Sequence, residues 1–266
     1  LYPLGVVLGL LLLSFQVGKV QRSFNLSTIP EVFEKCYKSP RLRKFASLIC
    51  ILSLTTILIG QGIAAKKFFT SMGFTSNFFF LSFWAIVVIY TAFGGLKAVV
   101  QTDICQAIFM MAVLAITFCF LLLNNKLSLP TQTLQELKTG AINSPYFSWL
   151  FMPMLYMLIE QDMAQRCFSA KKTFDIPKAC RYSAFLVFLC VVPAVLIGLS
   201  ARSLGLQFNP EACMLTEFIF STCPEWLSIL FNCAILVAVI STADSLICSI
   251  SSLFVYDFFK NVKFQK

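Results

Sequence analysis

The 266-residue sequence contains no histidine, and only 12% of its residues are charged, against about 25% in an ordinary soluble domain. Without histidine, neither a Cys/His catalytic pair nor a Cys/His zinc site can form. The sequence also lacks a P-loop, a Gly-rich dinucleotide loop and a G-x-S-x-G elbow. We therefore expect a protein that is not an enzyme and binds no cofactor.

Apolar residues are abundant: they make up 58% of the chain, and the mean hydropathy is +0.82. They occur in continuous runs of about 20 residues, the length that an α-helix needs to cross a bilayer. We predict an all-α, polytopic membrane helix bundle. Its spans are expected at about 1–16, 46–70, 77–96, 100–124, 146–166, 181–201 and 225–256.

The distribution of Lys and Arg over the loops gives the orientation. Most of the 21 basic residues fall in alternate loops, and the other loops hold only Lys66, Lys67, Lys126, Lys138 and Arg202. Cytoplasmic loops carry the excess of Lys and Arg, so the C-terminus is predicted to be cytoplasmic, with the protein in a cytoplasmic or inner membrane. This topology accounts for most of the net charge of +9, which needs no nucleic acid to explain it.

A stripe of small and hydroxyl-bearing residues runs along the last predicted span. Ala238, Ser241, Thr242 and Ser245 share one helix face at i, i+3, i+4 and i+7. Hydroxyl and carbonyl oxygens are ligands for hard cations, and transporters hold coupling ions near the membrane midplane. Small residues also allow close helix packing, so the spacing alone leaves both interpretations open.

Five carboxylates lie in or at the ends of apolar spans: Asp103, Glu160, Asp162, Asp244 and Asp257. Buried charge is costly in a membrane and is typical of functional sites. Asp257 precedes a basic segment and is expected at a solvated helix end, and Asp162 is expected to pair with Arg166 four residues later. For Asp103, function and a local role near Lys97 remain open. Glu160 is the preferred candidate for a substrate or ion pathway.

Local signals suggest several further features. Thr91–Gly95 suits a tight reversal, and a short interfacial helix is expected over Leu26–Phe33, started by Ser27 or Thr28 and Pro30. Gly60 and Gly62 favour close approach of another helix or of a substrate. Cys213 and Cys223 share a predicted external loop, where they are either oxidised or two free thiols.

Several stretches together resemble the sodium/solute symporter family, which includes sodium/proline, sodium/pantothenate and sodium/glucose symporters. They are YTAFGGLKAVVQTDICQ (90–106), TIPEVFEKCY (28–37), the pair Gln165–Arg166, and STADSLICSISS (241–252) followed by Asp257. The first and last are the specific ones. Their order and spacing extend the resemblance over nearly the whole chain.

The resemblance implies a five-plus-five inverted-repeat, LeuT-type transporter fold in one domain over 1–266, with the spans matching core helices two to eight and the chain truncated at both ends. It places Ala238, Ser241 and Thr242, with Ser245 as a possible addition, at a sodium site. It links Asp103 with sodium coupling. Tyr156, Glu160 and Gln61 are the candidates for the substrate pathway, and Pro153 is expected to break the fifth span.

The function predicted from these features is sodium-coupled secondary transport, with Na⁺, a small organic solute and the lipid bilayer as partners. The fifth span lacks the aromatic and Asn pattern of sugar carriers, which favours an amino acid, a vitamin or another small organic acid. Two alternatives stay open: a membrane sensor domain of a signalling protein, and a non-transporting fragment of an interrupted symporter gene. A proton in place of sodium also stays open.

Overall fold

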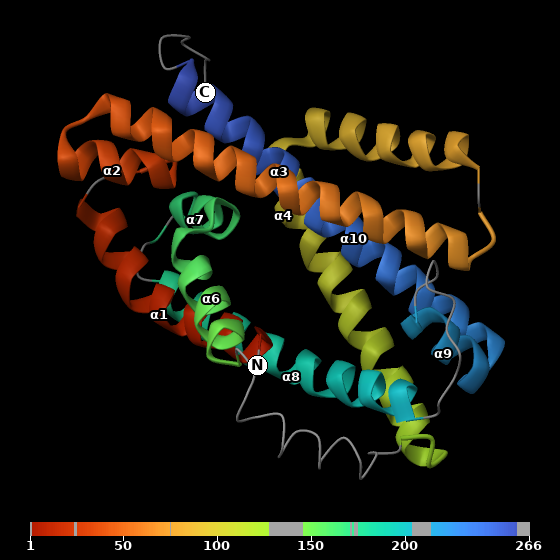
Figure 1. Cartoon of the computed structure of the whole chain (residues 1–266). Helices are drawn as coiled ribbons and strands as arrows, with labels where there is room; N and C mark the ends of the chain where they lie inside the picture. The colour runs from red at the N-terminus through yellow and green to blue at the C-terminus, as the bar shows by residue number, and fades with distance from the viewer. Residues whose placement is uncertain are drawn as a thin grey trace. The chain divides into compact units, whose positions relative to one another are not determined.

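A computed structural model describes residues 2–23, 26–74, 76–127, 146–170, 172, 175–203 and 214–259. Every regular element among these residues is helical. The elements are α1 (Tyr2–Ser23), α2 (Ile29–Tyr37), α3 (Pro40–Ser71), α4 (Asn77–Leu123), α6 (Tyr146–Ile159), α7 (Gln161–Phe168), α8 (Ile176–Ser203), α9 (Met214–Thr222), α10 (Glu225–Leu253) and the π-helix η1 (Phe254–Phe258) (Figure 1).

Long apolar helices dominate the described part of the chain. Pro40–Ser71, Asn77–Leu123, Ile176–Ala201 and Glu225–Phe258 are long and apolar enough to cross a membrane, and Tyr2–Leu12 is a shorter apolar stretch. These helices confirm the predicted all-α, multi-pass membrane bundle. The third and fourth predicted spans are joined in α4, whereas the fifth is divided between α6 and α7.

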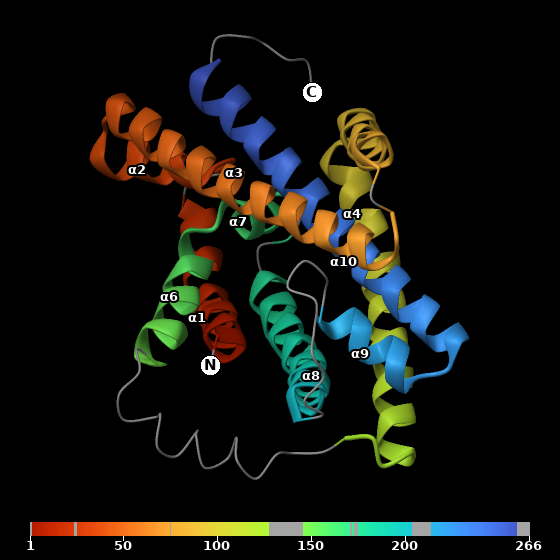
Figure 2. The same cartoon turned by 45° about the vertical axis from the view of Figure 1, so that its right-hand side comes forward.

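A glycine divides α4 into two helices that run in different directions. Gly95 has φ 60° and ψ −174°, a combination that is essentially restricted to glycine. Figures 1 and 2 show the sharp turn midway along α4. The turn expected at Thr91–Gly95 is therefore confirmed at its last residue.

The chain forms two compact units. Unit 1 comprises Leu1–Ile57, Pro145–Phe188 and Leu246–Lys266; unit 2 comprises Leu58–Ser144 and Leu189–Ser245. Three helices, α3, α8 and α10, contribute residues to both units.

In unit 1, α1 packs along α6, and the two helices lie side by side in both views (Figures 1 and 2). Glycines permit the close approach. A Cβ atom at Gly5 would lie 2.3 Å from the carbonyl oxygen of Leu150, and one at Gly9 would lie 2.7 Å from Cβ of Met157. Side chains of α1, α6 and α8 then bury Leu10, Met157 and Ala184.

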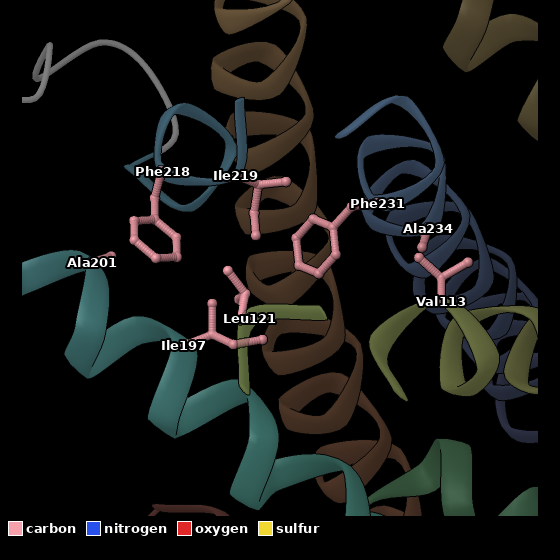
Figure 3. Close-up of a cluster of buried hydrophobic side chains, with 8 residues drawn as sticks. All are labelled: Val113, Leu121, Ile197, Ala201, Phe218, Ile219, Phe231 and Ala234. Atoms are coloured by element: carbon pink, nitrogen blue, oxygen red, sulfur yellow. The ribbon is translucent and has the colours of Figure 1, made fainter. Parts of the chain in front are cut away.

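In unit 2, apolar side chains from four helices form the core, as Figure 3 shows. Its members are Val113 and Leu121 from α4, Ile197 and Ala201 from α8, Phe218 and Ile219 from α9, and Phe231 and Ala234 from α10. A second cluster joins Ala65, Phe68 and Phe69 of α3 to Val239 of α10. These two clusters hold the part of α10 up to Ser245 in unit 2, and this part carries the predicted sodium-binding face.

Candidate functional site

The hydroxylic face of α10 lies in unit 2. Ala238 and Ser241 are half-buried, Thr242 is exposed and Ser245 is buried. The Thr242 hydroxyl donates a hydrogen bond to the carbonyl oxygen of Ala238 at 2.9 Å. A hydroxyl that donates its proton still has lone pairs with which to face a cation. The Thr242 hydroxyl and the Ala238 carbonyl oxygen therefore lie together on one turn of α10.

Asp103 of α4 approaches this same face. The Ser241 hydroxyl donates to Oδ1 of Asp103 at 2.5 Å, although 138 residues separate the two. A half-buried carboxylate thus contacts the hydroxylic face and gives it a negative charge. The two residues were predicted separately, and the structure brings them into direct contact.

A second carboxylate of α10, Asp244, is fully buried in unit 2 and is held by hydroxyls of α4. Tyr90 donates to Oδ2 of Asp244, and Thr91 donates to Oδ1 at 2.7 Å. Asp244 was expected only as a carboxylate in or at the end of an apolar span, without a specific role. Its partners lie in the stretch 90–106, one of the two specific pieces of the family resemblance.

The fifth span breaks at Glu160 and not at Pro153. Pro153 lies inside α6, which continues to Ile159, whereas Glu160 has φ −71° and ψ 115° and begins α7 as its N-cap. Proline has a helix-compatible φ and removes only one backbone donor, so α6 tolerates it. Glu160 is half-buried at the break, and the half-buried Tyr156 is hydrogen-bonded to Ser53 of α3.

After the break, α7 is anchored in unit 1 through its polar face. The buried Gln165 donates to Ser252 of α10 at 2.8 Å and accepts a hydrogen bond from Ser249 at 3.1 Å. The side-chain oxygen of Gln161 accepts the backbone N–H of Ile29 at 2.8 Å. The continuation of the hydroxylic stripe to Ser249 and Ser252 thus holds α7 to the end of α10.

The expectation of a solvated Asp257 is wrong, because this side chain is only 3% exposed. Its Oδ1 accepts hydrogen bonds from Nε of Arg43 at 2.7 Å and from the hydroxyl of Thr28 at 2.9 Å. Arg43 also contacts Glu34 of α2 at 2.5 Å. Burial is possible because a cation and a hydroxyl both bind Oδ1 of the carboxylate. Thr28 precedes α2 as predicted, but its hydroxyl caps no backbone N–H.

Asp162 and Arg166 of α7 form the expected ion pair at 3.7 Å.

The other predicted positions lie in different parts of the chain. Gln61 is half-buried on α3 and belongs to unit 2, whereas Tyr156 and Glu160 belong to unit 1. No other described helix comes within 4 Å of a Cβ atom built at Gly60 or Gly62, whereas close helix approach occurs at Gly5 and Gly9. Cys213 lies outside the described residues.

A helical multi-pass bundle with a hydroxylic face and a carboxylate on its apolar helices is typical of a membrane transporter. The comparisons with known proteins agree. The model of the Sodium:solute symporter family matches residues 1–266, and the chain belongs to this family.

Curated relatives support the assignment. The chain is 28% identical over 264 residues to the sodium/proline symporter of Haemophilus influenzae. The aligned region covers 89% of this chain and 51% of the relative. It is 27% identical over 280 residues to the human high affinity choline transporter 1 (95% and 47%) and 24% identical over 256 residues to the sodium/pantothenate symporter of Haemophilus influenzae (92% and 53%).

These relatives are named as symporters or transporters, which confirms the expectation that the chain is not an enzyme. The chain spans about half the length of the curated relatives it matches.

Proposed function

We propose that this chain is the sodium-binding part of a sodium-coupled symporter of a small organic solute. The observation that carries the proposal is the contact between Asp103 and Ser241 on the hydroxylic face of α10. It supports a cation site because it joins a carboxylate to hydroxyl and carbonyl oxygens in an apolar setting.

The oxygens proposed to face sodium are those of Ser241, Thr242 and the Ala238 carbonyl, with Ser245 one turn further along α10. The hydrogen bond from Thr242 to Ala238 fixes two of them relative to each other. Asp103 supplies negative charge, which attracts a cation to the face. Asp244 is assigned no ligand role, because its oxygens accept hydrogen bonds from Tyr90 and Thr91.

The proposed solute pathway includes the break between α6 and α7 in unit 1, where Tyr156 and Glu160 lie. Gln61 of α3 is a separate candidate for solute binding in unit 2. A helix break exposes backbone groups that helical bonds would otherwise satisfy, and such groups bind polar substrates in membrane transporters. The sodium gradient and the membrane potential would drive transport, the potential contributing about 2.3 kcal/mol per charge per 100 mV. An amino acid, a vitamin or another small organic acid is the proposed solute class.

The test is isotope uptake into vesicles reconstituted with the protein, with proline, pantothenate and choline as the first solutes because relatives are named for them. We expect uptake of at least one solute that depends on an inward sodium gradient. Replacing Ser241 and Thr242 together by Ala should abolish that dependence. Thr102→Ala is the matched control, since this exposed hydroxyl only contacts its own helix backbone.

Sodium-independent uptake, or sodium-dependent uptake that the double substitution leaves unchanged, would overturn the proposal. Direct binding of ²²Na⁺ to the purified protein separates ion binding from solute choice. Binding should fall in Asp103→Asn and in the double variant, but not in Thr102→Ala.

A further inference from the structure

Two cysteines of unit 1, distant from the hydroxylic face in sequence, meet where α7 ends and α8 begins. Cys167 is the penultimate residue of α7, and Cys180 lies in the first turns of α8. Their thiols are hydrogen-bonded to each other. Sulfur atoms in such contact need only a short further approach to reach the bond length of about 2.05 Å in a disulfide.

The surroundings of this pair leave both thiols beside a cavity. Cys180 is 5% exposed and packs with Ile176, whereas Cys167 is partly buried at the edge of the same cluster. Both line a cavity of about 270 Å³, to which Arg166, Asp175 and Ser183 also contribute. A reagent that enters this cavity therefore meets both cysteines.

We propose that Cys167 and Cys180 form a dithiol site. Low-molecular-weight disulfides such as glutathione disulfide oxidise it reversibly to an intramolecular disulfide. The thiolate of one cysteine attacks one sulfur of glutathione disulfide and releases one glutathione thiolate. The thiolate of the other cysteine then attacks the protein sulfur of the mixed disulfide and releases the second. Two protein thiols lose their protons, and two electrons pass to the glutathione disulfide.

The arrangement suits this sequence of steps. The cavity carries charge of both signs, from Arg166, which also pairs with Asp162, and from Asp175, and the second thiol resolves the mixed disulfide from within the protein. The bond would fasten the end of α7 to the start of α8. By the distribution of basic residues this end of the bundle is cytoplasmic, so the pair is reduced at rest and becomes oxidised when the glutathione pool does.

The test treats the purified protein in detergent with glutathione disulfide, blocks remaining thiols with a maleimide and digests with trypsin. Cleavage after Arg166, Lys171, Lys178 and Arg181 gives the peptides CFSAK and ACR, which contain the two cysteines. We expect these peptides joined by a disulfide, with a mass lower by two hydrogen atoms than the sum of the two. Dithiothreitol should release them.

Two variants make the test specific. Cys167→Ser and Cys180→Ser should each abolish the joined peptides and stop the reaction at a mixed disulfide with glutathione on the remaining cysteine. Cys105→Ser, at an exposed cysteine of α4, should leave the joined peptides unchanged. Glutathionylation of either cysteine as the only product in the wild-type protein would overturn the proposal, as would maleimide labelling of both cysteines after oxidation. Neither result depends on transport or on sodium.

Discussion

Asp257 in unit 1 and Asp244 in unit 2 are buried carboxylates thirteen residues apart on one continuous helical stretch, yet their partners differ in kind. Asp257 is held by the guanidinium of Arg43 together with a hydroxyl, and Asp244 by two hydroxyls. The first arrangement neutralises a charge, whereas the second only solvates it. Loss of one partner should therefore cost more in unit 1 than in unit 2.

The two units also differ in their apolar packing. In unit 1, α1 and α6 approach closely enough that a methyl group at Gly5 or Gly9 would overlap its neighbours. In unit 2, large side chains such as Phe218, Leu121 and Ile197 fill the core. Unit 1 is sensitive to added volume and to unpaired charge, and unit 2 is sensitive mainly to truncated side chains.

The largest effect is expected for Arg43→Ala. The substitution leaves Asp257 buried without its cation, which typically costs about 3–5 kcal/mol. The thermal midpoint of the purified protein in detergent, followed by size-exclusion chromatography after heating, should fall sharply. Arg41→Ala is the control, because Arg41 is exposed two residues earlier in α3.

A double-mutant cycle then separates pairing from packing. Replacing Arg43 by Met and Asp257 by Leu removes both charges and should recover much of the stability that Arg43→Ala loses. Equal thermal midpoints for Arg43→Ala and Arg41→Ala would contradict the interpretation of Asp257 as a charge-paired residue.

The next largest effect is expected for Gly9→Ala. The added Cβ would lie 2.7 Å from Cβ of Met157 and 2.8 Å from the carbonyl oxygen of Met154, so α1 and α6 must separate. Overpacking of this kind costs about 1–3 kcal/mol. The matched substitution Gly60→Ala meets no described atom within 4 Å and should be neutral, or stabilising by up to about 1 kcal/mol through helix propensity. We expect a lower thermal midpoint for Gly9→Ala and an unchanged or higher thermal midpoint for Gly60→Ala.

Features set by neighbouring residues were predicted from the sequence. The turn at Gly95, the start of α2 after Thr28 and the pairing of Asp162 with Arg166 each depend on residues within a few positions of one another. The four helices long enough to span the membrane followed from composition and run length.

Long-range pairing was not predicted. Asp257 meets Arg43 across 214 residues and Thr28 across 229, and helical periodicity carries no information on such contacts. The basic segment after Asp257 suggested a solvated helix end. The cation that binds Asp257, Arg43, lies far away in the sequence and leaves no local signal. The contact of Asp103 with Ser241 has the same origin: each residue was recognised, but the sequence did not reveal that they touch.

The smallest effect is expected for Thr91→Val in unit 2. This isosteric change removes the hydroxyl that donates to Asp244 at 2.7 Å, while Tyr90 continues to donate to the other carboxylate oxygen. Interhelical hydrogen bonds in membrane proteins contribute about 0.6 kcal/mol on average and about 1.7 kcal/mol at most, so the thermal midpoint should fall modestly. Thr102→Val, on the same helix, removes a hydroxyl that contacts only its own backbone and should have less effect. A loss as large as that of Arg43→Ala would mean that Asp244 needs both hydroxyls to stay buried as an anion, and the contrast between the two units would disappear.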